Sequence, residues 1–462
     1  MKRGQITVFL ALLLSVICGF LLAVIESTRV SAMRMQIESG LDLGLHSIFA
    51  EYDRALLSRY DLFYIDTSYR GESTDISGIE THLYNYMETN ISQDQKSGKS
   101  SGDWFRMSVK NLELPKYLLA SDHEGRVLRR QVVRYMKQRN IVDQAETGNS
   151  LVNQIQSYGL EERDIDGERT SAENRIKEIP IPEVINMVNG LRGGSTAELT
   201  TGGMKISEGR FQEQQLYSHR THKVGKDVAV FQEGIAGEEA DQLFDAYLML
   251  KCSDYTESKG QGVMTYELEY LIAGQNSDLE NLDDITRKLL KMREAANVTY
   301  LFGSEEKRAE AEEYALLLTA GVEIPGLTEA VTISLLYAWG YAEAVLDVNC
   351  LLCGGKVPIM KSDADWRLPL KELLVFRSHF GESGGSGFTY RQYLSAYLAK
   401  EDAVIKRSRC MDVIEENVRL MEGNKRFCMD GCIEYVQAYV EASSRYGYEY
   451  NILRDYGYEV NE

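Results

Sequence analysis

The chain of 462 residues carries 51 basic and 70 acidic side chains, which gives a net charge of −19 at neutral pH. Phosphate recognition needs a basic face, so this balance argues against a nucleic-acid partner. The combination of 6 prolines with 44% apolar residues predicts a mostly helical, well-packed chain, and 7 cysteines are too few for a scaffold built on disulfides.

An uncharged apolar run opens the chain, from Ile6 to Ile25. As a helix its 20 residues would span about 30 Å, which is the thickness of a bilayer's hydrocarbon core. Lys2 and Arg3 precede the run, and the residues after it are mixed in charge. The positive-inside rule therefore places the N-terminus inside the cell.

A cleaved signal peptide is the alternative interpretation of this run. Its apolar core would be about 7–15 residues long and would end at a small-x-small cleavage site. The run is longer, and Ala23-Val24-Ile25-Glu26 offers no such site. We therefore expect a single-pass anchor in the cytoplasmic membrane, with residues 1–5 inside, residues 6–25 bound to lipid, and the bulk of the chain outside.

Apolar positions continue beyond the run at steps of three and four residues, which is helical spacing. They are Val30, Met33, Ile37, Leu41, Leu45, Ile48, Tyr52 and Leu56. The spacing predicts one helix from residue 6 to about residue 59, with an amphipathic second half over residues 26–60. Gly40 and Gly44 mark places for a bend or for close packing. Periodicity alone leaves two interpretations open, a helix that lies on its own domain or a packing surface for other subunits.

Three short segments carry a family resemblance, namely Lys2-Arg3-Gly4-Gln5, Val8-Phe9-Leu10-Ala11-Leu12 and Ile25-Glu26. Through them the first part of the chain, to about residue 65, resembles the TadE/TadG group of bacterial Flp-type (Tad) pilus proteins. The resemblance implies a short basic N-terminus, one hydrophobic helix, an exported remainder, and other pilus or secretion-apparatus subunits as partners.

The same resemblance bears on processing. A prepilin-type cleavage would fall between Gly4 and Gln5, and such sites normally have Glu at the fifth mature position. Phe9 stands there instead. The resemblance therefore implies an uncleaved, TadG-like role rather than a pilin subunit, with Gly4 and Gln5 as the only candidate processing site.

The first exported region is expected over residues 61–144. Alternation and turn residues there predict elements in the order strand 61–66, helix 79–91, flexible loop 93–102, strand 104–114 and helix 124–138. Residues 145–235 are polar and punctuated by glycine pairs, which is typical of a linker or an irregular insertion.

The second exported region is expected over residues 236–462. Alternation from Val263 to Ile272 predicts a half-buried strand with Glu267 and Glu269 on its wet face. A capping box at Ser277 opens a helix. Further helices are predicted at 305–320, 327–352, 390–398 and 402–421, and a closing pair of strands at 433–440 and 446–452.

The segment 327–352 is strongly apolar but contains Glu329, Glu343 and Asp347. Carboxylates are expensive in a bilayer, so we expect a buried core helix rather than a second span, with Glu343 and Asp347 bonded to Arg or Lys. The predicted fold is α+β and mostly helical. It begins with a transmembrane helix that continues into a long amphipathic helix, followed by an exported helical domain with a small antiparallel sheet.

A second resemblance covers residues 105 to about 462. Its segments are Tyr266-Glu267-Leu268-Glu269-Tyr270-Leu271-Ile272-Ala273-Gly274, Asn281-Leu282, Arg293 to Asn297-Val298, Ala338-Trp339-Gly340-Tyr341-Ala342-Glu343, Val345-Leu346-Asp347, Lys356-Val357-Pro358 and Asp365-Trp366. This part resembles a domain of unknown function found in large exported proteins beside bacterial Tad-like pilus genes. The resemblance implies location and company rather than a reaction.

Cysteine pairs are the strongest candidates for chemistry. Cys350 and Cys353 form a CxxC, and Cys428 and Cys432 are the other close pair. Buried thiols, a disulfide and half of a zinc site remain open, in that order of preference, because a second CxxC is absent. His219 and His222 lack the intervening Glu of a zinc protease helix. We therefore expect no catalytic, cofactor-binding or metal-binding residues.

The sequence thus predicts a non-enzymatic, membrane-anchored structural or assembly component of a Tad/Flp-like pilus or secretion apparatus. The first alternative is a cell-surface module that binds a ligand or an envelope polymer, which the 28 tyrosines suggest. The second is an envelope enzyme, which would need His, Cys or paired carboxylates to converge in a pocket.

Overall fold

The computed structural model describes residues 2–69, 71, 75–91, 105, 107–139, 143–160, 162–176, 182–226, 237–322 and 324–458. The chain divides into two compact units. Unit 1 comprises Met1–Gln131, Thr221–Glu233 and Met421–Glu462, and unit 2 comprises Val132–Arg220 and Gly234–Leu420. The predicted class is confirmed, since the chain is mostly helical α+β with a long apolar N-terminal helix and small antiparallel sheets. The loop predicted at 93–102 lies outside the described residues.

Unit 1 is organised around α1 (Lys2–Phe49). The prediction of one helix to about residue 59 is wrong, because α1 ends at Phe49 and a separate helix, α2 (Arg54–Tyr60), follows. Asp53 marks the start of the second helix. Its carboxylate accepts a hydrogen bond from the backbone N–H of Leu56 at 2.7 Å, which caps α2.

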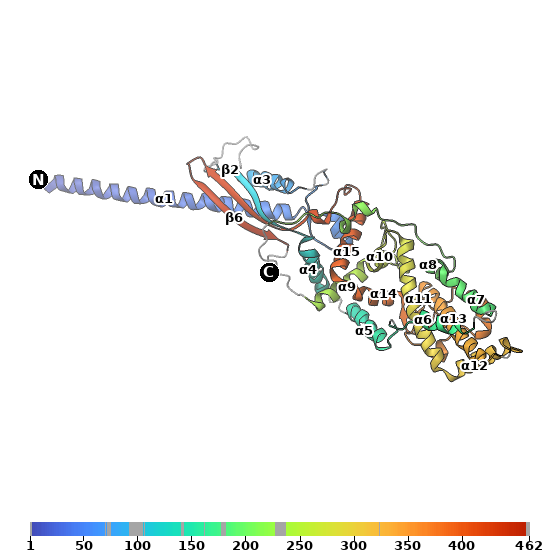
Figure 1. The fold of residues 1–462 in the computed structure, drawn as a ribbon. Coiled ribbons are helices and arrows are strands. Elements are labelled where there is room, and N and C mark those ends of the chain that lie inside the picture. Colours follow the sequence, from blue (N-terminus) through green and yellow to red (C-terminus); the bar gives the residue numbers. More distant parts are fainter. Residues whose placement is uncertain are drawn as a thin grey trace. The chain divides into compact units, whose positions relative to one another are not determined.

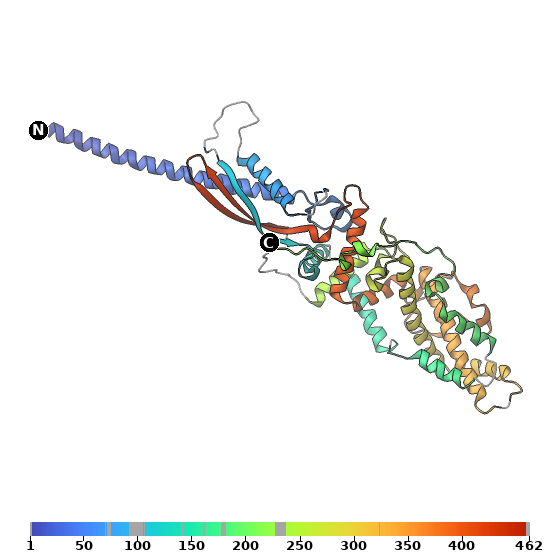
Figure 2. The same ribbon diagram turned by 45° about the horizontal axis from the view of Figure 1, so that its top comes forward.

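A four-stranded antiparallel sheet lies along the second half of α1 (Figure 1, Figure 2). Its central strand is β5 (Cys432–Ser444), which pairs with β1 (Ile65–Asp66), β2 (Met107–Leu119) and β6 (Glu449–Gly457). Alternate residues of β5 are buried, so one face of the sheet joins the core with α1. The predicted closing pair of strands is confirmed as β5 and β6, whereas the strand expected at 61–66 is reduced to β1.

Helix α3 (Ser77–Ile91) packs closely against α1 at the two glycines. A Cβ at Gly40 would lie 3.1 Å from Ile91, and one at Gly44 would lie 2.9 Å from Leu83. The sequence left two roles open for these glycines, a bend or close packing. The structure shows close packing, because both glycines permit the close approach of α3. Helix α4 (Asp122–Gln138) follows β2.

Unit 2 is helical, and α13 lies at its centre. This helix packs against α6, α7, α8, α11 and α12, and its residues are buried without interruption from Ser334 to Leu352. The expectation of a buried core helix is therefore confirmed. The helices that follow residue 236 are α9 (Glu238–Lys251), α10 (Glu267–Ala273), α11 (Asp278–Gly303), α12 (Glu305–Leu318), α13 (Leu327–Leu352), α14 (Tyr390–Lys400) and α15 (Ala403–Arg419). Two short strands, β3 (Lys356–Val357) and β4 (Phe388–Thr389), form a second sheet.

The strand predicted from Val263 to Ile272 is wrong, because residues Glu267–Ala273 form α10. Both faces of this segment are buried, so the alternation of apolar and polar residues does not mark a face exposed to solvent. Backbone N–H groups, rather than water, donate to both carboxylates. Glu267 accepts from the N–H of Ser253 at 2.8 Å, and Glu269 accepts from the N–H of Tyr255 at 2.9 Å.

Residues 145–235, which the sequence left as a linker or an irregular insertion, contain several helices. They are the greater part of α5 (Asp143–Ser157), α6 (Ile165–Asn174), α7 (Glu183–Gly190) and α8 (Thr196–Thr201). Helix α8 is fastened to α11, because the Thr196 hydroxyl and the Ala197 N–H both donate to Asp283. The part of this segment up to Arg220 therefore belongs to the packing of unit 2, whereas the residues from Thr221 on belong to unit 1.

Candidate functional site

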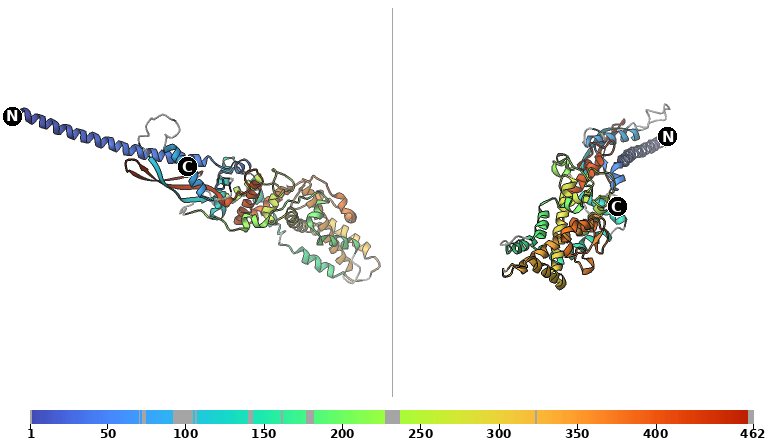
Figure 3. Two further views of the ribbon diagram at one scale, coloured as in Figure 1. Left: turned by 90° about the horizontal axis from the view of Figure 1, so that it is seen from above. Right: turned by 90° about the vertical axis from the view of Figure 1, so that its right-hand side faces the viewer.

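The N-terminal half of α1 is an exposed apolar surface. The helix Gln5–Phe49 has a mean hydropathy of 3.0 in its most apolar window, and none of that window is buried. Figure 3 shows this half of the helix extending away from the sheet of unit 1. It is the one helix in the described chain that is long and apolar enough to cross a membrane, a property that an N-terminal signal sequence shares. Gly4 and Gln5 lie in its first turns.

The apolar stripe of the second half faces the protein's own core. Met33, Ile37, Leu41, Leu45 and Ile48 are buried in one cluster with α3 and the sheet, and Val30 packs at its edge. Leu56, on α2, is also buried. Tyr52 lies in the link that joins α1 to α2 and is half-buried. The helix therefore lies on its own domain. The chain itself covers the fully buried positions of the stripe, while Val30 and Tyr52 stay partly exposed.

Unit 2 holds a cluster of four buried charges, which we call the α13 charge cluster. Lys361 contacts the carboxylates of both Glu343 and Asp347, the latter at 2.6 Å, and Arg293 contacts Asp347 at 3.1 Å. Each of the four side chains is at most 1% exposed. The expected pairing of Glu343 and Asp347 with Arg or Lys is what the structure shows, and the two cations balance the two anions.

Further hydrogen bonds complete the α13 charge cluster. The Arg293 guanidinium donates to the carbonyl oxygens of Pro358 and Ile359, each at 2.7 Å. Glu343 accepts from the backbone N–H groups of Arg367 and Leu368 at 3.0 and 2.9 Å. Burial would raise the pKa of Asp347, but Lys361 and Arg293 outweigh it and hold the pKa below its usual value. The cluster fastens the segment 358–368 to α11 and α13.

A hollow of about 220 Å³ lies beside this cluster. Its lining includes Asp347, Lys356, Asp365, Arg367, Glu382 and Gly384. Asp365 already accepts hydrogen bonds from Ser362 and Ser386. The Arg367 side chain has no carboxylate within ion-pair distance in the described part of the chain, and lies beside the Cys350 thiol. Burial would lower the pKa of Arg367, but the Cys350 thiol and the carboxylates of Asp347 and Glu343 raise it. The lining holds as many carboxylates as basic side chains, so the charges around the hollow are balanced.

The four candidate cysteines are all free thiols. Cys350 is buried and its Sγ lies 3.6 Å from the Gly384 carbonyl oxygen, whereas Cys353 is half-buried and points to Asn349. Burial raises the pKa of Cys353, so its thiolate is disfavoured. Cys432 is buried and donates to the carbonyl oxygen of Cys428 at 3.4 Å. The structure therefore shows none of these four thiols in a disulfide.

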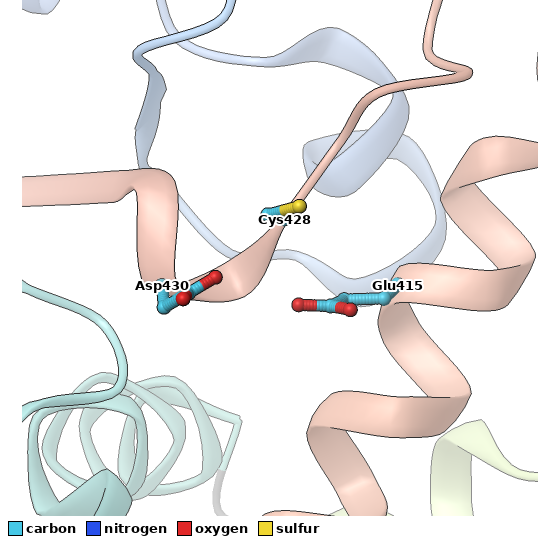
Figure 4. A group of neighbouring side chains, drawn as sticks. All are labelled: Glu415, Cys428 and Asp430. Atoms are coloured by element: carbon cyan, nitrogen blue, oxygen red, sulfur yellow. The ribbon is translucent and has the colours of Figure 1, made fainter. Parts of the chain in front are cut away.

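The remaining candidates for chemistry are two acidic side chains near Cys428 and the histidines. The two acidic side chains already accept hydrogen bonds, and the histidines are at least partly exposed. Figure 4 shows Cys428 and Asp430 at the turn before β5, and Glu415 on α15. Within unit 1 Asp430 accepts from the N–H of Lys223 at 2.9 Å, and within unit 2 Glu415 accepts from Arg220 at 2.6 Å. None of the six histidines is buried.

Sequence reasoning found the carboxylates of the α13 charge cluster but missed their cations. Arg293, Asn297, Glu343 and Asp347 all fall within the segments that carry the second resemblance, which was an available signal. Lys361 stands outside those segments, in an ordinary polar stretch. Only the fold brings it 2.6 Å from Asp347.

These features define a mostly helical α+β protein with one N-terminal helix able to cross a membrane and a charged core in its helical unit. Comparison with known families gives a narrower statement. The model of DUF5702, a family of unknown function, matches residues 172–444, and the chain belongs to this family. No curated protein and no solved structure matches the chain.

Proposed function

We propose that the protein is a membrane-anchored, non-enzymatic structural or assembly component of a Tad/Flp-like pilus or secretion apparatus, with its N-terminus in the cytoplasm. The observation that carries the proposal is the continuity of α1. One helix exposes an apolar half and buries one face of its other half in the core of unit 1. The TadE/TadG-like residues at the N-terminus support the choice of apparatus.

The chemistry of the candidate residues supports a role other than catalysis. The paired carboxylates Glu343 and Asp347 are neutralised by Lys361 and Arg293. Glu343 also accepts from backbone N–H groups, and Asp347 accepts from the side-chain amide of Asn297. A general acid or base needs a lone pair or a proton that substrate can reach. Neither carboxylate of this pair offers one, because both are fully buried.

Removal of residues 1–25 tests the anchor. We expect the full chain in the membrane pellet after a carbonate wash and the truncated chain in the supernatant. Mass spectrometry of the membrane fraction should recover the N-terminal peptide, because a retained anchor keeps it. The anchoring claim would be refuted if the truncated chain stayed in the membrane pellet. It would also be refuted if the protein expressed from the full-length gene were found to lack residues 1–25.

Photo-crosslinking in cells tests the assembly role. Because the stripe is buried, the crosslinker belongs on the opposite face of α1, at Met35, which is 68% exposed. A crosslinker at Ile37, which is fully buried, is the matched control. We expect Met35 to capture a pilus or secretion subunit, identified by mass spectrometry, and Ile37 to capture none. Capture of neither would count against an apparatus subunit at this face.

A further inference from the structure

The turn between β5 and β6 contacts α1 directly after the apolar run ends. The Tyr448 hydroxyl donates a hydrogen bond to Glu26, and the Tyr450 hydroxyl donates to the Val30 carbonyl oxygen at 3.3 Å. The guanidinium of Arg29 lies 3.9 Å from the centre of the Tyr446 ring. Figure 1 and Figure 2 show this turn beside α1, with its tip toward the exposed half of the helix.

The height of these contacts follows from helix geometry. A helix rises 1.5 Å per residue, so Glu26 to Val30 lie about 2–8 Å beyond Ile25, the last residue of the apolar run. The headgroup layer on one side of a bilayer is about 5–8 Å thick. With residues 6–25 in the hydrocarbon core, the contacts between the turn and α1 fall inside the headgroup layer.

The side chains of the turn suit that layer. Tyr446 is 45% exposed, and Tyr448 and Tyr450 are partly exposed. Tyrosine is enriched at membrane interfaces because its ring is apolar and its hydroxyl is polar. Arg445 is exposed next to Tyr446, where a guanidinium can bind lipid phosphate. Hydrogen bonding to Glu26 raises the pKa of Tyr448, which keeps its ring uncharged.

We propose that residues 445–448 form a second membrane contact, with the Tyr446 ring among the lipid glycerol and carbonyl groups and Arg445 at the phosphates. The occupant of this surface is the lipid headgroup layer. The turn and α1 then hold the sheet of unit 1 at two points, which fixes its height and tilt at the bilayer. The inference rests on the anchor in the proposed function.

Depth-dependent fluorescence quenching tests the contact on the full chain in phosphatidylcholine and phosphatidylglycerol vesicles. Cys18, Cys353 and Cys428 are first replaced by Ser, because the other cysteines are buried. A fluorophore is then placed at Tyr446→Cys or Arg445→Cys. Leu453→Cys is the control, since Leu453 is 49% exposed but lies about 13 Å along β6 from Glu449.

With nitroxide lipids labelled near the headgroup, we expect the fluorophores at 445 and 446 to lose most of their emission and the one at 453 to keep it. A second chain keeps Cys18 as its labelled cysteine, with Cys353 and Cys428 replaced by Ser. Quenching of its fluorophore by lipids with a nitroxide deep in the acyl chain reports on the anchor. Quenching at 18 without quenching at 445 or 446 overturns the second contact alone. No quenching at 18 overturns the anchor on which it rests.

Discussion

Glu269 is a buried carboxyl group that the fold holds in its protonated form. It is fully buried on α10, where its Oε1 accepts from the Tyr255 N–H at 2.9 Å and from the Tyr390 hydroxyl at 2.8 Å. Its Oε2 has no hydrogen-bond partner among the described residues. Burial, with the nearby Asp254 carboxylate, raises the pKa of Glu269 to about 8.

This shift makes the stability of unit 2 depend on pH. An unfolded Glu titrates near 4.5, so below that pH both states carry the proton and the group has no effect. As pH rises toward 8, the unfolded state loses its proton while the folded state keeps it, and stability falls. One pKa unit corresponds to about 1.4 kcal/mol, so between pH 5 and pH 8 this group removes about 3 kcal/mol.

Glu269→Gln removes the titration while it keeps the shape of the side chain. We expect the variant and the parent to have similar free energies of unfolding at pH 5, and the variant to be more stable by about 3 kcal/mol at pH 8. Urea denaturation of the full chain in detergent measures this. Trp339 and Trp366 both belong to unit 2, so fluorescence reports on that unit once Trp104 is replaced by Phe.

Glu312→Gln is the matched control, because Glu312 is exposed on α12 in the same unit. Its effect should stay below about 0.5 kcal/mol at both pH values. A difference in free energy of unfolding between Glu269→Gln and the parent that is the same at pH 5 and at pH 8 would contradict the raised pKa of Glu269.

Two further predictions concern the buried packing. Lys361→Met should lower the free energy of unfolding of unit 2 by about 3–5 kcal/mol in the same fluorescence assay, because Glu343 and Asp347 lose their shared cation. Adding Glu343→Gln should recover part of that loss; no recovery would mean that charge is not the cause. Gly44→Val should destabilise unit 1 by about 1–3 kcal/mol in thermal unfolding followed by circular dichroism, since its Cβ would meet Leu83 at 2.9 Å. Gly19→Val, whose Cβ meets nothing within 4 Å, should leave unfolding unchanged, and equal effects would contradict the packing argument.

Periodicity predicted the long helices because their chemistry is local. The capping residue Ser277 accepts from the Glu280 N–H as expected for the start of α11, and α13 is buried without interruption from Ser334 to Leu352. The signal failed where polar groups are satisfied at long range. The sequence pattern predicts that Glu267 and Glu269 face solvent. Both are buried on α10 instead, where they accept hydrogen bonds from the backbone N–H groups of Ser253 and Tyr255.

The candidate site was predictable to the same extent. Helical spacing placed Glu343 and Asp347 on one face of α13 and predicted a basic partner, but it could not select Lys361 from 51 basic residues. The break at Asp53 was missed for a similar reason. An Asp between two apolar stretches can cap a helix or face water, and only the N–H of Leu56 decides which.

The buried stripe also limits how the protein can assemble through α1. A partner helix could reach Met33, Ile37 or Leu41 only by displacing α3 and the sheet, since these residues have no exposed area. The face that remains is the opposite one, where Met35 and Leu43 are 68% and 55% exposed. Covering an exposed apolar side chain with a partner is favourable because it removes apolar area from water. We therefore expect contacts between subunits to follow the exposed half of α1 and the Met35–Leu43 face, and to leave the core of unit 1 unchanged.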